Sequence, residues 1–193
     1  MITVTYYVGI EDKGKNMIST INFRNNVNRF WTDYIDWVED YTSLTGTGQD
    51  SSDLYWQIIR YLSVFYNEVR SVYGRTAAED VTKCIAAMFE GLTQAKILIE
   101  NDIDPAPVTE RVATEVIGKL ATTLAGLNPE WKPEVVTPLF VNMWQAWLDH
   151  CRATLANNIE DADAAETKAM LSALAFSDAF INGAIKQYSP IFF

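Results

Sequence analysis

The chain has 193 residues, of which 49% are hydrophobic and 21% are charged, and its formal net charge is −10. This composition can fill a sizeable core and differs from that of a disordered chain. Because phosphate binding depends on Lys and Arg, the negative charge makes nucleic acids and anionic membrane surfaces poor partners. We therefore expect a folded protein with no nucleic-acid partner and no membrane partner.

Residues 1–16 are predicted to form an extended N-terminal arm. Apolar residues alternate along residues 2–10, which is the pattern of a β-strand. A lone strand needs a second one, so the arm either lies on its own domain or adds to a sheet edge of a partner chain. The arm lacks the basic start and apolar core of a signal peptide, and the chain has no run of 18 apolar residues. We therefore expect a cytoplasmic or other intracellular protein.

The first helix is predicted over residues 18–41. One face of it is formed by residues that recur every three or four positions and are predicted to point inward: Ile21, Arg24, Asn28, Trp31, Ile35 and Val38. An adjoining face is aromatic and comprises Phe30, Tyr34, Trp37 and Tyr41. A helix with so wide an apolar sector must be surrounded by other helices.

Five further helices follow in the sequence. The second ends at Tyr73, where Gly74 stops it, and the third begins at a capping box formed by Thr76 and Glu79. After a proline-rich break, the last three helices are predicted at residues 108–127, 133–159 and 161–188. The tail that ends in Phe192 and Phe193 is expected to pack against the domain. The sequence thus predicts a single all-α domain over residues 17–193, an up-and-down bundle of about six helices.

Few residues indicate chemistry. Cys84 and Cys151 lie among apolar neighbours in helical segments and are predicted to be buried free thiols. His150 is the one histidine, and no Glu-x-x-His pair is present, so the pattern of a di-iron site is missing. A lone histidine is by default structural. We accordingly predict no catalytic residue, no metal ligand and no cofactor.

Acidic residues gather at two places. Asp33, Asp36 and Asp40 share a face of the first helix, beside Glu39. Paired carboxylates can hold a hard cation or transfer protons, but here a solvated face is favoured because the neighbouring stripe is aromatic. A second group, near the start of the last helix, comprises Asp161, Asp163 and Glu166. We interpret these acids as first-turn residues stabilised by the helix dipole.

Three residues of the first helix are candidates for lining a pocket. Arg24 and Asn28 are polar residues on the stripe that is predicted to face inward, and Trp31 follows them on it. Buried polar side chains need partners, whereas in a pocket they could hold a ligand.

Four segments of the chain resemble an uncharacterised family of bacterial helical-bundle proteins, some of which are mislabelled as acetylglutamate kinases or glycosyltransferases. The segments are residues 28–32 (NRFWT), 70–74 (RSVYG), 120–131 (LATTLAGLNPEW) and 178–188 (DAFINGAIKQY). The resemblance covers residues 20–193 and implies a helical bundle. Members of the family tend to carry histidines on three helices. At the corresponding places this chain has Asn28, then Met88 or Gly91, then Asn142 or Met143. The resemblance therefore implies that the family's core histidines are missing here.

These observations favour a non-enzymatic structural or interaction protein that self-associates or binds a protein partner. A component of a larger assembly or viral particle would belong to this class. The alternative is a small-ligand or metal-binding helical bundle that descends from a histidine-bearing relative.

Overall fold

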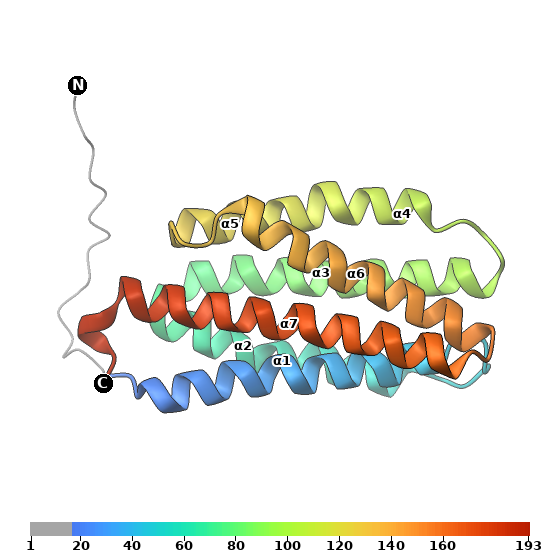
Figure 1. Cartoon of the computed structure of the whole chain (residues 1–193), viewed down its shortest axis with the longest axis horizontal. Helices are drawn as coiled ribbons and strands as arrows, with labels where there is room; N and C mark the ends of the chain where they lie inside the picture. Colours follow the sequence, from blue (N-terminus) through green and yellow to red (C-terminus); the bar gives the residue numbers. More distant parts are fainter. Residues whose placement is uncertain (1–16) are drawn as a thin grey trace, which may run out of the picture.

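The computed structural model describes residues 17–193, which form an all-α bundle (Figure 1). The predicted arm, residues 1–16, lies outside the described residues. The helices are α1 (Thr20–Ser43), α2 (Ser52–Tyr73), α3 (Arg75–Glu100), α4 (Ala106–Arg111), α5 (Gly118–Leu127), α6 (Pro133–Leu155) and α7 (Ile159–Gln187). A π-helical segment, Val112–Ile117, joins α4 to α5. Because α4, this segment and α5 form one continuous rod, the described residues make six rods, and the predicted fold class is confirmed.

The helix α1 lies against α2, α6 and α7 (Figure 1). It runs antiparallel to α7, so the beginning of α1 meets the end of α7 and the end of α1 meets the beginning of α7. Aromatic residues fill the space between these helices. Trp31 lies edge-on to Phe65 and Phe176, with ring centroids 5.5 and 5.2 Å apart. Phe180 stacks on Trp131 at 4.7 Å.

The buried face of α1 differs from the predicted stripe. Ile21, which we expected to point inward, is 69% exposed, and Arg24 and Asn28 are only half-buried. The buried residues of α1 are Phe23, Val27, Phe30, Trp31, Tyr34, Ile35, Val38, Tyr41 and Thr42. The face is rotated toward the aromatic side chains because these bury the most apolar surface.

Two predicted helix ends require correction. The capping box at Thr76 is wrong, because α3 already begins at Arg75, and the Glu79 carboxylate pairs with Arg75 at 2.7 Å. The boundary predicted after Ile159 is also wrong. The helix α6 ends at Leu155, Asn157 adopts a φ of 54°, and Ile159 opens α7. Gly74, with a φ of 84°, ends α2 as predicted.

The two ends of the described chain meet. The Ile18 N–H donates to the Ile191 carbonyl at 2.8 Å, and Ile18 and Phe192 form a single parallel β-bridge. The Phe192 ring lies 5.1 Å from that of Phe23, whereas Phe193 is 68% exposed. The predicted packing of the tail is therefore right for Phe192 and wrong for Phe193. None of the helices in residues 17–193 has the length and apolar character needed to cross a membrane.

Candidate functional site

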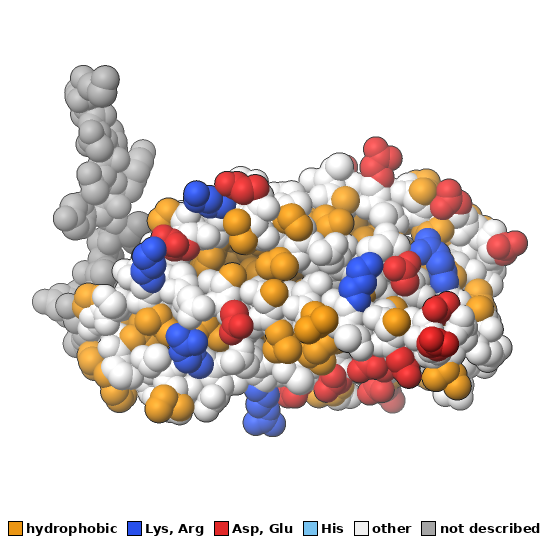
Figure 2. Space-filling view, in the orientation of Figure 1, with side chains coloured by type: hydrophobic (Ala, Val, Ile, Leu, Met, Phe, Trp, Pro, Cys, Tyr) orange, Lys and Arg blue, Asp and Glu red, His pale blue; other side chains and the backbone are white. Residues whose placement is uncertain are grey.

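Three carboxylates from two helices converge at the end of α1. One carboxylate oxygen each from Asp36, Glu39 and Glu166 lies within 4.8 Å of the others. Asp36 and Glu39 are three residues apart and so lie on one side of α1, and the antiparallel packing of α7 brings Glu166 to them. Glu166 is not a first-turn residue, as we had interpreted it, because α7 begins at Ile159. Acidic side chains gather along the lower edge of the molecule, where α1 and α7 run side by side (Figure 2).

The carboxylates lack a neutralising partner. In the part of the chain that the structure describes, none of the three forms an ion pair with Lys or Arg. Burial, followed by a hydrogen bond with Glu166 and its negative charge, raises the pKa of Glu39 to about 7. Burial and the nearby charges of Asp33, Glu166 and Asp40 also raise the pKa of Asp36. At neutral pH the group therefore favours a bound proton or cation.

A buried histidine on a third helix borders the same place. His150 of α6 is 5% exposed, and its Nδ1 lies 2.8 Å from the Thr42 hydroxyl oxygen. Burial lowers its pKa, although the charges of Glu166 and Asp163 act in the opposite direction. The ring is therefore neutral at pH 7, which is the form that can bind a metal ion.

His150, Glu39 and Glu166 line one small cavity of about 10 Å³. The rest of its lining is Ile35, Thr42, Ala146, Trp147, Ala165 and Ala169. The three alanines leave the space that larger side chains would fill. A volume of about one water molecule excludes an organic ligand.

Trp147, which lines this cavity, is 2% exposed. Its indole N–H has no hydrogen-bond partner among residues 17–193. A buried donor without an acceptor costs about 1–3 kcal/mol, so most such groups have a partner or a bound water. Trp31, Tyr34 and Trp144 also have a buried polar atom without a partner among the described residues, so the unpaired N–H of Trp147 is a feature of the aromatic core and not of the cavity alone.

The predicted pocket residues lie elsewhere. The Arg24 guanidinium donates to the Asn182 side-chain oxygen at 2.9 Å, and the Ser177 hydroxyl donates to Asn28 at 2.7 Å. Trp31 is fully enclosed by aromatic rings. The three residues join α1 to the rest of the bundle and are not part of the lining of the small cavity.

The cysteines are buried and free, as predicted. Burial raises the pKa of the Cys151 thiol to about 11 and also raises that of Cys84. Because the thiolate is the nucleophile, neither residue is suited to nucleophilic chemistry at neutral pH.

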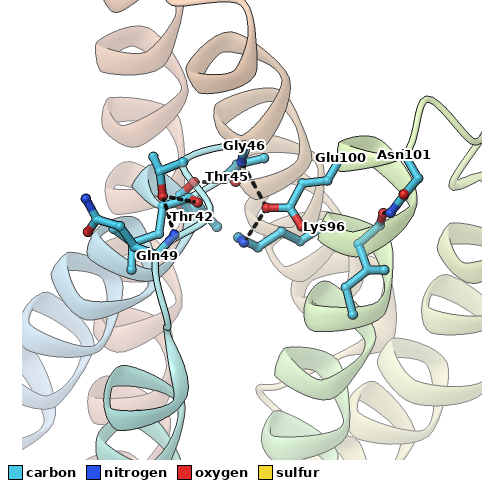
Figure 3. A network of polar contacts seen from close by, with 10 residues as sticks. Thr42, Thr45, Gly46, Gln49, Lys96, Glu100 and Asn101 are labelled. Atoms are coloured by element: carbon cyan, nitrogen blue, oxygen red, sulfur yellow. Dashed lines mark hydrogen bonds and ion pairs between the residues drawn. The ribbon is translucent and has the colours of Figure 1, made fainter.

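A second polar network, near the loop between α1 and α2, is internally satisfied (Figure 3). Lys96 is 6% exposed, and its ammonium lies 2.7 Å from the Glu100 carboxylate. The same carboxylate accepts the Gly46 N–H at 2.9 Å, while the ammonium lies 5.5 Å from the centre of the Tyr41 ring. Since each charge already has its partner, this network fastens the loop to α3 and needs no ligand.

Sequence reasoning brought together two of the three acids of the cluster. Asp36 was assigned to an acidic face of the first helix, with Glu39 beside it, but nothing linked them to Glu166 or His150. The available signal was the run of small residues, Ala165 and Ala169, on both sides of Glu166. Comparisons of the chain with protein families, with characterised proteins and with solved structures found no match.

Proposed function

We propose that this protein is a metal-binding helical bundle that holds one divalent cation between α1 and α7. The observation that carries the proposal is the meeting of the Asp36, Glu39 and Glu166 carboxylates within 4.8 Å of one another, where Asp36 is exposed and Glu39 and Glu166 are half-buried. Two oxygens that share a cation at about 2.0–2.6 Å lie no more than about 5.2 Å apart, so the three carboxylates are near enough to reach one ion after small side-chain movements. The ion would replace carboxylate repulsion by attraction and so cross-link the two helices.

This role is compatible with the structural protein that the sequence favours, because an ion that ties α1 to α7 stabilises the fold without any reaction. It corresponds to the alternative function, a metal-binding bundle, but with a different ligand set. The resemblance points to histidines near Asn28, Met88 and Asn142, whereas the acidic cluster lies at Glu39 and Glu166. The prediction of a protein partner or self-association stays a prediction.

The test is the titration of the full-length, untagged, chelator-treated protein with Mn²⁺ in a calorimeter at pH 7. We expect one ion per chain and a rise in the melting temperature as Mn²⁺ is added, because the ion binds only the folded state. The variant that combines Glu39→Gln with Glu166→Gln should lose both effects. Asp178→Asn removes one exposed acid from the other end of α7 and should retain both.

Two results would overturn the proposal. One is a wild-type protein that takes up no Mn²⁺ in stoichiometric amount. The other is binding that survives unchanged in the double variant, since the ion would then lie at a different place. Circular dichroism checks that the double variant remains helical, and the removal of two repelling charges makes this the expected result.

A further inference from the structure

One side of α7 is exposed along almost the whole helix. The residues of this side recur at intervals of three and four, so they form a straight line on the helix surface, which we call the outer stripe of α7. Its members, all exposed, are Glu160, Ala164, Lys168, Leu171, Ala175, Asp178, Asn182 and Lys186. Leu171, near the middle, is 64% exposed. Figure 2 views the face that α6 and α7 form, where hydrophobic side chains lie between basic and acidic ones.

The charges on the outer stripe are arranged symmetrically about its midpoint. From the start of the helix they alternate in sign, at Glu160, Lys168, Asp178 and Lys186. Glu160 and Lys186 stand 13 residues before and after Ala173, and Lys168 and Asp178 stand 5 residues before and after it. A second copy of α7 that lies antiparallel across the midpoint therefore sets every acid opposite a base. A parallel copy in the same register sets like charges opposite each other.

We infer that the outer stripe of α7 is a self-association face, at which two copies of this chain pair antiparallel about a two-fold axis. Such an axis uses the same surface on both copies, so the surface must be complementary to itself, as this one is in charge. The apolar residues obey the same symmetry. Leu171 of each copy lies opposite Ala175 of the other, and one large side chain against one small side chain lets two helices approach closely.

Both lysines of the stripe also have an acid of their own chain nearby. Lys168 Nζ lies 3.9 Å from the Asp149 carboxylate, and Lys186 Nζ lies 2.8 Å from the Glu130 carboxylate. All four side chains are at least 43% exposed, so these ion pairs are solvated and weak, and each lysine can be shared with a second acid. The two acids of the stripe form no ion pair within residues 17–193. They are therefore available to the lysines of a second copy.

The width of the face sets the strength of the contact. A face one helix wide falls below the roughly 1,200 Å² that stable complexes bury, so we expect a dissociation constant of about 100 µM. At about 1 µM the chain is then a monomer. Unfolding of Leu171→Ala at that concentration reports on the fold of a single chain.

Sedimentation equilibrium of the full-length, untagged protein between about 10 and 500 µM tests the inference, with a chelator present throughout. The wild type should show a monomer–dimer equilibrium that weakens as salt is added, because exposed charges are screened. Lys168→Glu and Asp178→Lys should each weaken the dimer at least about tenfold, since two like-charge pairs then replace two opposite ones.

An equal mixture of these two variants is the sharpest test. In a mixed dimer the two substituted positions face each other with opposite charges, and the two native positions do the same. The mixture should therefore associate about as tightly as the wild type, although neither variant does so alone. Lys83→Glu and Asp80→Lys make the same charge changes at exposed positions of α3 and should leave the wild-type dimer unchanged. Circular dichroism checks that all four variants remain helical.

Three results would overturn the inference. A wild type that stays monomeric at about 500 µM would leave the stripe without this occupant. A dimer that persists in both charge variants would lie on another face of the chain. A mixture that fails to associate would show that Lys168 and Asp178 do not meet across the contact. Because the chelator removes metal ions, dimer formation is measured independently of Mn²⁺ binding, and either proposal can fail while the other stands.

Discussion

The two ends of the interface between α1 and α7 differ in what fills them. Near the start of α1, α7 contributes Phe176 and Phe180, and the Phe176 ring lies 5.2 Å from that of Trp31. Near the end of α1, α7 contributes Ala165 and Ala169, and a small cavity remains beside Glu39. One pair of helices therefore supplies both a dry aromatic core and a polar site.

The difference shows that side-chain volume on α7 decides where polar groups can gather. Where α7 carries large rings, the interface is filled. The Ser177 hydroxyl donates to Asn28 there, whereas the indole N–H of Trp31 has no partner among the described residues. Where it carries alanine, Glu39 and Glu166 approach each other without filling the space between them. The predictions below alter first the aromatic end and then the polar end.

The largest effect is expected from Phe180→Ala. This ring contacts the rings of Trp131 and Phe65 at 4.7 and 5.2 Å and three further aromatic rings. Its removal should lower the free energy of unfolding by about 3–5 kcal/mol, because the rigid surroundings leave a cavity. Urea denaturation measures this loss. The control Leu171→Ala, at a residue that is 64% exposed on the same helix, should change the value by less than about 0.5 kcal/mol. Equal losses in the two variants would show that the aromatic end is not rigidly packed.

A smaller effect is expected from Ala169→Leu, which gives the polar end a large side chain. Ala169 is buried and lines the cavity of about 10 Å³, which cannot accept three further carbon atoms. Overpacking should cost about 1–3 kcal/mol and should also abolish Mn²⁺ binding. Ala175→Leu, at an exposed position of α7, is the matched control and should affect neither quantity. Retained Mn²⁺ binding in Ala169→Leu would place the ion outside the cavity.

The helical bundle was predictable because apolar residues recur at helical spacing over long segments, and because glycine and proline residues end these segments clearly. Gly74 and the proline-rich segment after α3 end helices by backbone chemistry that is local to the sequence. The prediction of a capping box at Thr76 was wrong, and the cause of this error is also local to the sequence. Gly74 takes the cap position, and Glu79 gains more from Arg75 than from the backbone at Thr76.

The candidate site was less predictable because its parts come from three helices. Asp36 and Glu39 are neighbours on one helix, and their spacing is visible in the sequence. The contact with Glu166 depends on the register of α7 against α1, which is set by the packing of the aromatic end. The burial of His150 depends in addition on how α6 lies against both helices, and no local pattern specifies that arrangement.

The smallest effect is the pH dependence of the free energy of unfolding of the metal-free protein. It tests whether burial raises the pKa of Glu39 in the folded state. Its pKa is raised from an ordinary 4.5 to about 7, so between these values the folded chain binds more protons than the unfolded one. Stability must then fall as the pH rises from 5 to 7.5, by about 1 kcal/mol once solvent screening is allowed for.

Urea midpoints in the presence of a chelator measure this slope, and Glu39→Gln should flatten it. His150 has a lowered pKa and acts in the opposite sense, since its unfolded form binds the extra proton. The difference between wild type and Glu39→Gln cancels that contribution, whereas Asp178→Asn should keep the wild-type slope. An unchanged slope in Glu39→Gln would mean that this carboxylate is solvated like any surface acid, and the contrast between the two ends of the α1–α7 interface would then be one of packing alone.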